Sequence, residues 1–379
     1  MKPSERDARK LIGLRGSRFL IPTPALVVDL DAAEANIRKM AERARTANFA
    51  LRPHAKSHKS ATLARTQISA GAVGVCCAKL GEAEALIEAG IRGILLTSPV
   101  VSKAAMVRAA DLAAVDQEFA MVVDHPTLIV PLADAVSAKG VKLKVLIDVD
   151  VGLGRTGVAN PASAVAIAEG ISTFPCLDLI GVQGYGGHWQ HIAGFEKRLA
   201  AVKDGMTKLR ETIEVLRARG FSVPLVTGGG TGTFAADGLI RTLNEIQPGS
   251  YLFMDLQYRD ALAADADGEF AQSLFVQAQV ISMNAQAWVT VDAGLKAFAT
   301  DGPVPRPFTP KYADSTYAYF GDEHGALSRP GGASVDLGER VEFIPPHCDP
   351  TVDRFDVYHL VRDDTLVDIV PIEAARCSQ

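Results

Sequence analysis

A lysine flanked by histidines follows a short β-rich run in the first part of the chain. The segment reads RPHAKSHK over residues 52–59, and its proline prevents a regular helix from continuing there. We therefore expect Lys56 close to the carboxyl end of a strand. A lysine among ring nitrogens and apolar strand ends could have a depressed pKa and form a Schiff base with a carbonyl compound. The alternative is a solvated lysine whose stem packs on the surface.

Two glycine-rich segments follow later strands. TGGGTGT covers residues 227–233, and QPGSY covers residues 247–251 after Leu243–Ile246. Successive glycines let backbone N–H groups converge on an anion, and hydroxyl groups add further donors. Either segment alone could be an ordinary turn. Together, in consecutive loops, they favour a phosphate-binding site.

The segment GLGRTG at residues 152–157 matches the dinucleotide-binding pattern but lacks its context. Asn160-Pro161 interrupts the chain where the helix of that motif should already have begun. We therefore reject a Rossmann site. Arg155 remains a candidate cation at the carboxyl end of a strand.

The loop QGYGGHWQH at residues 183–191 is unusually dense in polar and ring side chains. His188 or His191 could act as a general base, because imidazole titrates near neutral pH. A purely structural histidine is the alternative for either one.

The segment PPHCDP at residues 345–350 offers an imidazole and a carboxylate. If it is extended, His347 and Asp349 point the same way and Cys348 points the opposite way. This donor pair suits Mn²⁺, Mg²⁺ or Co²⁺ better than a thiolate-bound zinc, although water or substrate would have to complete the shell. The alternative is a proline-rich turn with a capped aspartate.

Alternating strand-like and helix-like segments must position these residues. Strands are predicted at 25–28, 50–52, 73–77, 93–96, 120–123, 143–149, 179–183 and 224–227. About eight such repeats favour a closed (β/α)8 barrel over an open doubly wound sheet. Beyond residue 260, alternating runs predict a mostly antiparallel β-domain at 274–282, 288–292, 341–344, 355–360 and 366–372. We expect a barrel over 23–260 and a β-domain over 261–379, with residues 1–22 packing on the latter.

Composition narrows the classes of function. The 379 residues are 48% hydrophobic and 22% charged, with 39 Lys plus Arg against 44 Asp plus Glu, a net charge of −5. No basic block suggests nucleic acid as a partner. No signal peptide or apolar run of membrane-spanning length is found, and five cysteines form no disulfide framework. We expect a cytoplasmic α/β enzyme.

The motifs as a set resemble the bacterial D-threonine aldolases. The likeness extends in order from about residue 23 to the C-terminus through RPHAKSHK, DVDVGLGRTGV, GVQGYGGHWQH, TGGGTGT, QPGSYLFMD, DAGLK, DEHG and PPHCDP. That family is the metal-activated branch of the alanine-racemase-like fold, also called fold type III of the pyridoxal 5'-phosphate (PLP) enzymes. The resemblance implies PLP, a divalent metal (Mn²⁺ before Mg²⁺ or Co²⁺) and a homodimer.

The resemblance also implies roles for individual residues. Lys56 would form the Schiff base with PLP, and His191 would be the catalytic base. His347 and Asp349 would bind the metal; related dehydratases have a cysteine at the second position. The remaining cofactor-binding positions would be Arg155, Gln183, Tyr185, Thr231, Gly232, Gly249, Ser250 and Tyr251.

The expected reaction is retro-aldol cleavage of a D-β-hydroxy-α-amino acid. D-Threonine would yield glycine and acetaldehyde, with the metal lowering the pKa of the β-hydroxyl. The same residue types also fit a D-serine or D-threo-3-hydroxyaspartate dehydratase. A racemase is less favoured because it would need a second base in the β-domain and no metal. A non-catalytic PLP-binding protein is less favoured because such proteins resemble the barrel alone.

Overall fold

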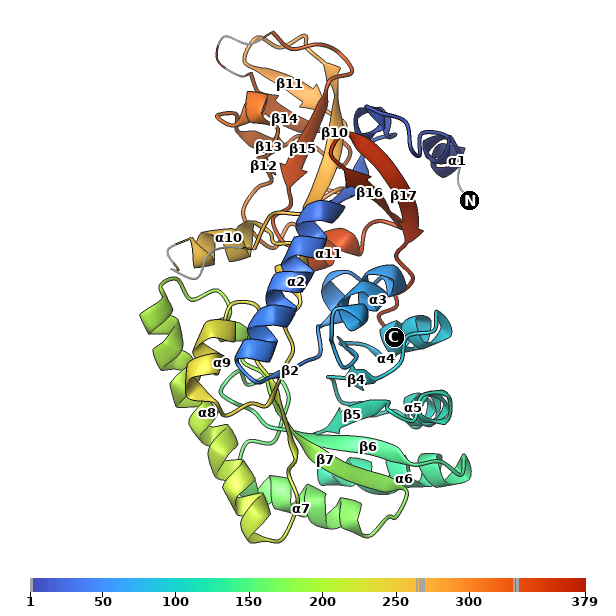
Figure 1. Ribbon diagram of the computed structural model, residues 1–379, viewed down its shortest axis with the longest axis vertical. Coiled ribbons are helices and arrows are strands. Elements are labelled where there is room, and N and C mark those ends of the chain that lie inside the picture. Colours follow the sequence, from blue (N-terminus) through green and yellow to red (C-terminus); the bar gives the residue numbers. More distant parts are fainter. Residues whose placement is uncertain (1–2, 264, 266–269, 330, 332–333) are drawn as a thin grey trace.

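The structure, a computed structural model, describes residues 3–263, 265, 270–329, 331 and 334–379. Two units lie one above the other along its long axis (Figure 1). The lower unit is an α/β barrel and the upper unit is built from a second, mostly antiparallel sheet. This arrangement confirms the predicted fold class. None of the described helices combines the length and apolar character needed to span a membrane.

The barrel sheet contains eight parallel strands in the order β2-β9-β8-β7-β6-β5-β4-β3. A bridge between His54 and Cys76 brings the first and last strands of that order together and closes the sheet. The strands are β2 (Ala50–Leu51), β3 (Val75–Cys77), β4 (Ile94–Leu96), β5 (Ala120–Val123), β6 (Leu143–Asp148), β7 (Leu177–Gly184), β8 (Leu225–Gly228) and β9 (Glu245–Ile246).

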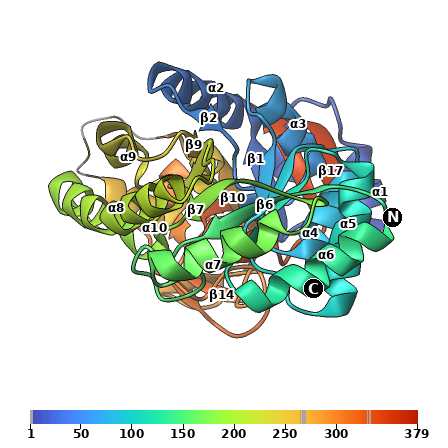
Figure 2. The same cartoon turned by 90° about the horizontal axis from the view of Figure 1, so that it is seen from below.

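Helices cover the outside of this sheet, as the view from below shows (Figure 2). Alternate strand residues contact the helices, while Cys76, Leu95, Val122 and Leu146 form a separate small cluster with Ala120. The helices after the strands are α3 (Ala61–Ser69), α4 (Leu80–Glu88), α5 (Lys103–Val115), α6 (Ile129–Ala138), α7 (Pro161–Ser172), α8 (Phe195–Ala218), α9 (Phe234–Ile240) and α10 (Leu256–Leu262).

The second sheet follows the order β13-β14-β11-β10-β1-β16-β17, with β15 pairing to β10 and β12 pairing to β15. Its strands from residue 274 onward are β10 (Leu274–Ser282), β11 (Trp288–Val291), β12 (Arg306–Pro307), β13 (Tyr317–Tyr319), β14 (Gly325–Ser328), β15 (Arg340–Ile344), β16 (Val357–Arg362) and β17 (Thr365–Pro371). The short helix α11 (Cys348–Val352) connects β15 to β16.

The strand predicted at 25–28 does not belong to the barrel. It is β1 (Ala25–Asp29), which pairs antiparallel with β10 and parallel with β16. The eighth barrel strand is instead β9, which lies directly before QPGSY. The sequence prediction counted β1 into the barrel because its apolar run is followed by a helix, α2 (Leu30–Thr46), like the others.

The N-terminal segment packs on the β-domain. Ala8 and Ile21 lie in an apolar cluster with residues of β16 and β17. After α1 (Pro3–Arg9), the short helix η1 (Ser17–Leu20) carries Arg18, whose Nε and Nη2 donate to the two carboxylate oxygens of Glu342 at 2.8 and 2.9 Å. A bidentate pair in a buried position fixes the segment in both distance and orientation.

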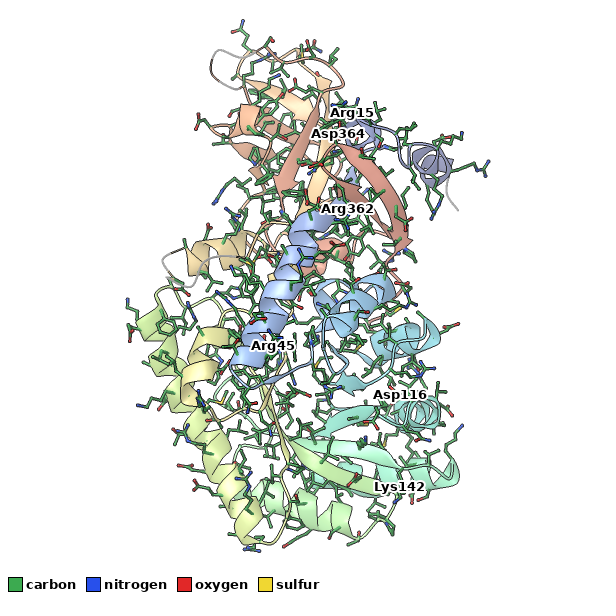
Figure 3. The ribbon with its side chains drawn as sticks, viewed as in Figure 1. Arg15, Arg45, Asp116, Lys142, Arg362 and Asp364 are labelled. Atoms are coloured by element: carbon green, nitrogen blue, oxygen red, sulfur yellow. The ribbon has the colours of Figure 1, made fainter. Side chains whose placement is uncertain are left out.

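We expect Arg18→Met to destabilise the protein strongly, because it leaves Glu342 buried without its cation. Loss of one partner of a buried pair costs about 3–5 kcal/mol of unfolding free energy. Arg15→Met is the matched control: Arg15 is 94% exposed and lies 3.6 Å from Asp364 (Figure 3). That exposed pair should contribute less than about 1 kcal/mol. Urea unfolding of both variants measures the difference, and equal losses would contradict the assignment.

Candidate functional site

A cavity of about 480 Å³ opens at the carboxyl ends of the barrel strands. Its walls come from segments that follow β2, β3, β4, β6 and β9 and from the end of β7. Four of the predicted site residues line it, namely Lys56, Arg155, Gln183 and Tyr185. Sequence analysis did not select other lining residues, among them His54, Lys79, Thr97, Thr156 and Gln247.

Lys56 lies in the single-turn helix η2 (Ala55–Ser57), directly after β2. The ring Nδ1 of His54 accepts the N–H of Lys56 at 3.4 Å, and the hydroxyl of Ser57 donates to the carbonyl oxygen of His54 at 3.2 Å. These local bonds form the turn, and Lys56 lies close to the carboxyl end of a strand, as expected. The Lys56 Nζ contacts the Asp349 Oδ2 of the β-domain.

The charge environment of Lys56 differs from the expectation. Burial alone would lower the pKa of Lys56, but the negative charge of Asp349 outweighs it and raises the pKa above its ordinary value. The predicted depressed pKa is therefore wrong for this structure. Nothing near Lys56 in the sequence reveals this contact, because its partner lies 293 residues further along the chain.

A hydrogen-bonded polar network forms one wall of the cavity. Gln183 Nε2 donates to Asp148 Oδ1 at 2.9 Å, and Gln247 Nε2 donates to Gln183 Oε1 at 3.2 Å. Burial raises the pKa of Asp148 to about 6, even though the hydrogen bonds from Gln183 and Thr156 favour its charged form. Each side chain is held by at least one neighbour, so this wall is preorganised.

Two further features of the cavity concern rings. The guanidinium carbon of Arg155 lies 5.4 Å from the ring centre of Tyr185, within cation–π distance. The Nε2 of His54 lies 3.1 Å from Thr97 Oγ1. Burial, and then the charge of Lys56, lowers the pKa of His54 well below its ordinary value, so this ring is neutral near pH 7.

The two glycine-rich loops lie against each other beside this cavity. The hydroxyl of Thr231 accepts the N–H of Tyr251 at 3.0 Å, and Gly249 approaches His54 closely. The phenol of Tyr251 lies in the barrel core, where its oxygen accepts a hydrogen bond from Gln67 at 3.0 Å. Of the expected phosphate-binding positions Thr231, Gly232, Gly249, Ser250 and Tyr251, none is a lining residue of the cavity.

Glycine is required in the first loop because Gln190 fills the space around it. A Cβ on Gly230 would lie 2.5 Å from Gln190 Oε1, and a Cβ on Gly232 would lie 2.1 Å from the Gln190 carbonyl oxygen. The N–H of Gly232 donates to Gln190 Oε1 at 2.9 Å. The loop that carries His191 therefore also shapes the glycine-rich loop.

His191 follows the short helix η4 (Gly187–Trp189), and its ring centre lies 4.5 Å from that of Tyr258. Burial, and then the charges of His347 and Lys56, lowers the pKa of His191, so it can accept a proton near neutral pH. Arg198 Nη1 donates to the carbonyl oxygen of the next residue, Ile192, at 2.6 Å. His188, the other candidate base, is exposed, as His191 is, and packs on Trp189.

The segment predicted to be extended at 347–349 is helical from Cys348 onward. Only His347, the N-cap of α11, has extended backbone angles. The N–H of Cys348 donates to the buried Asp255 at 2.8 Å, which starts the helix, and Cys348 itself is fully buried. The alternation argument for His347 and Asp349 required an extended segment, so it is wrong here.

His347 and Asp349 nevertheless remain the donors available to a metal at this place. Nδ1 of His347 lies 2.8 Å from Asp301 Oδ2, a carboxylate that sequence analysis did not select. That contact leaves Nε2 of His347 as the ring nitrogen for a ligand, the usual arrangement of metal-binding histidines. Within the part of the chain that the structure describes, no group of three His, Cys, Asp or Glu side chains converges as a metal site.

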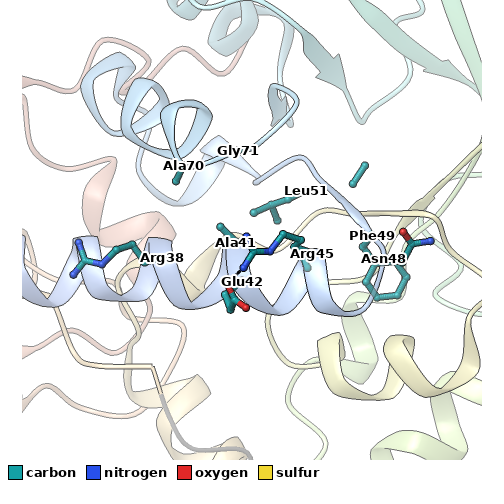
Figure 4. A pocket seen from close by; sticks show the side chains of 11 residues that line it. Arg38, Ala41, Glu42, Arg45, Asn48, Phe49, Leu51, Ala70 and Gly71 are labelled. Atoms are coloured by element: carbon teal, nitrogen blue, oxygen red, sulfur yellow. Dashed lines mark hydrogen bonds and ion pairs between the residues drawn. The ribbon is translucent and has the colours of Figure 1, made fainter.

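A larger groove lies elsewhere and contains no predicted site residue. It has a volume of about 640 Å³ and follows the last turns of α2, where Arg38, Glu42 and Arg45 face the end of α3 (Figure 4). Its size alone does not make it the active site, because the carboxylate among its lining residues, Glu42, is exposed and paired with Arg45.

The glycine-rich loop generates a testable pH dependence. Thr233 Oγ1 accepts the N–H of Gly230 at 3.0 Å and donates to Asp237 Oδ2 at 2.7 Å. Burial raises the pKa of Asp237 to about 7. The folded state therefore binds the proton of the Asp237 carboxyl group more tightly than the unfolded state does. The stabilisation that comes from this bound proton is lost as the pH rises from about 4 to 7.

Asp237→Asn should remove this loss. Relative to the wild type, the variant should gain unfolding free energy by roughly 1.4 kcal/mol per pH unit within that window and stay level above it. Urea unfolding at pH 5, 6, 7 and 8 measures the difference. Parallel pH profiles of the two proteins would contradict the assignment.

Comparisons with known proteins show the family of the chain. Residues 28–257 match the family described as "Alanine racemase, N-terminal domain", and residues 273–361 match "Putative serine dehydratase domain". The chain is 36% identical to 3-hydroxy-D-aspartate aldolase of Paracoccus denitrificans (strain Pd 1222), over 93% of this chain and 92% of that protein. It is also 36% identical to D-threonine aldolase of an Arthrobacter species, over 93% of both chains.

A solved structure gives the same relationship. The crystal structure of D-threonine aldolase from Filomicrobium marinum superposes with a TM-score of 0.90 at 37% sequence identity, covering 95% of this chain and 97% of that one. Since both the family match and these relatives extend through the barrel and its site, the chain belongs to the alanine racemase N-terminal domain family, in the branch that contains the D-threonine and 3-hydroxy-D-aspartate aldolases.

Proposed function

We propose that the protein is an aldolase that uses PLP and a divalent metal to cleave D-β-hydroxy-α-amino acids, D-threonine among them, to glycine and an aldehyde. The observation that carries the proposal is the meeting of Lys56 with Asp349. An amine suited to a Schiff base and a carboxylate suited to a metal come from separate units and touch at one cavity. The relatives named as aldolases support the choice of reaction.

The residues present fit PLP. Lys56 provides the amine, the cavity of about 480 Å³ beside it has room for a small ring, and Arg155 and Tyr185 offer a cation and an aromatic face. The loops that carry Thr231 and Gly249 lie next to it and suit a phosphate by their glycines and hydroxyls. Bound there, PLP would supply an electron sink for the carbanion left at Cα when the Cα–Cβ bond breaks.

The donor set also fits a divalent ion of the harder kind. His347, oriented by Asp301, and Asp349 would hold Mn²⁺ or a similar ion, which would supply Lewis acidity at the β-hydroxyl of the substrate. His191 would take the proton of that hydroxyl, since its lowered pKa keeps the ring unprotonated and free to accept one. Arg155 is the cavity cation available to a substrate carboxylate. We further propose that the enzyme is a homodimer.

A dehydratase acting on D-serine or D-threo-3-hydroxyaspartate is the second candidate. The match of residues 273–361 to "Putative serine dehydratase domain" favours it. In that reaction Lys56 would remove the Cα proton, and the hydroxyl would leave as water. The carboxylate at position 349, where the resemblance gives dehydratases a cysteine, favours the aldolase.

Product analysis tests the proposed function. Purified protein supplied with PLP and Mn²⁺ should release glycine and acetaldehyde from D-threonine, because its site stabilises a carbanion at Cα. The Lys56→Ala variant should lose both this activity and the absorbance of the Schiff base. Pyruvate formed from D-serine, without glycine from D-threonine, would establish the dehydratase instead. A Lys56→Ala spectrum identical to the wild type would contradict the role of Lys56.

Metal dependence gives a separate prediction. A chelator should abolish turnover of D-threonine, and Mn²⁺ should restore it, because proton removal from the hydroxyl would otherwise be too slow. Asp349→Asn should lower kcat by about 100-fold or more, because loss of a group that merely orients a metal ligand already costs about 10–100-fold, while keeping the Schiff-base absorbance. Full turnover in excess chelator would contradict the proposal.

A further inference from the structure

The lysine three residues after Lys56 is buried between two carboxylates. The Nζ of Lys59 lies 2.6 Å from Asp353 Oδ1 and 3.1 Å from Glu82 Oε1, and its side chain is 9% exposed. Lys59 has a positive φ of 52°, which turns the chain sharply after η2. In a site with little water, an ammonium between two carboxylates is held in place by their positions.

Glu82 connects Lys59 to the barrel side of the cavity. Its other oxygen, Oε2, accepts the N–H of Ala78 at 2.9 Å and the N–H of Lys79 at 3.2 Å. Both of those residues line the cavity beside Lys56. Lys59 thus shares one carboxylate with the backbone of the cavity wall.

Asp353 connects Lys59 to the β-domain side. It is the C-cap of α11 and follows Asp349 by four residues, about one helical turn, so the two carboxylates lie on the same face of the helix. Asp353 Oδ1 also accepts the N–H of Arg376 at 2.7 Å. The helix that presents Asp349 to Lys56 is therefore held one turn further along by Lys59.

We propose that Lys59 is a positioning residue that sets the spacing between Lys56 and the pair His347 and Asp349 by holding α11 against the cavity wall. The inference rests on the proposed function, since it assigns the metal to that pair. Lys59 contacts neither reacting group. Its effect on the reaction passes through α11.

Other bonds hold this segment to the β-domain when the ion pair is lost. Tyr358 donates its hydroxyl hydrogen to the carbonyl oxygen of His58 at 2.7 Å, and the N–H of Ala374 donates to the carbonyl oxygen of Lys59 at 3.0 Å. Loss of the Asp353 carboxylate should therefore leave the chain folded and loosen only the last turn of α11, because the first turn stays bonded to Asp255. The Lys59–Glu82 pair stays intact in that variant.

Three variants test the proposal. Asp353→Ala removes the acceptor, whereas Asp353→Asn keeps an oxygen for Lys59 and for the N–H of Arg376. Asp364→Ala is the control, because Asp364 forms an exposed pair with Arg15 at the far end of the β-domain (Figure 3). For each protein, Mn²⁺ binding is measured from the electron paramagnetic resonance signal of free Mn²⁺, and the Schiff-base absorbance is measured after adding PLP.

Asp353→Ala should raise the Kd for Mn²⁺ by about 10-fold or more, the effect of losing a group that orients metal ligands. Its Schiff-base absorbance should match that of the wild type, Asp353→Asn should recover most of the Mn²⁺ affinity, and Asp364→Ala should change neither quantity. Equal Kd values for Asp353→Ala and the wild type would overturn the positioning role and leave the proposed function standing. A wild type that binds no Mn²⁺ at all would overturn the proposed metal and this inference together.

Discussion

The contact between the Lys56 amine and the Asp349 carboxylate joins the two units at the point where the chemistry would occur. Each group sits where burial disfavours its charge, and each keeps that charge because of the other. Removing either one alone would leave the other, partly buried beside the cavity, without its counter-charge. The candidate active site therefore exists only while the barrel and the β-domain keep their relative position.

Helix α2 is the main rigid link that maintains this position (Figure 1). Ala33 and Ile37, in its first half, belong to the apolar core of the β-domain, whereas Met40 and Ala44, in its second half, belong to the core of the barrel. A helix packed into two cores resists bending at both ends. The position of β1 in the β-domain sheet explains this geometry, because the chain leaves that sheet at Asp29 and enters α2 at once.

Local pattern predicted most of the fold and some of the site. Periodicity located seven of the eight barrel strands and five of the eight β-domain strands from residue 274 onward, because these alternate or cluster apolar residues in a way that depends only on near neighbours. It missed the short strands β9, β12, β13 and β14. Which sheet β1 joins depends on pairing with residues 274–277 and 359–361, and no local signal contains that information. No local signal predicts the site roles of Asp301 and Gln247 or the Lys56–Asp349 contact either, because each depends on groups distant in sequence.

At the start of α11, the buried carboxylate of Asp255 gives a helical turn in place of an extended segment, and Asp349 still faces the cavity lysine. Asp255 accepts the N–H of Cys348 and fixes the first turn there, so Cys348 packs into the β-domain core. Asp349 is then the residue of this turn that faces Lys56. A thiolate at that place would favour zinc, whereas a carboxylate favours ions that prefer oxygen. The helical turn thus selects the harder donor for the cavity by burying the softer one.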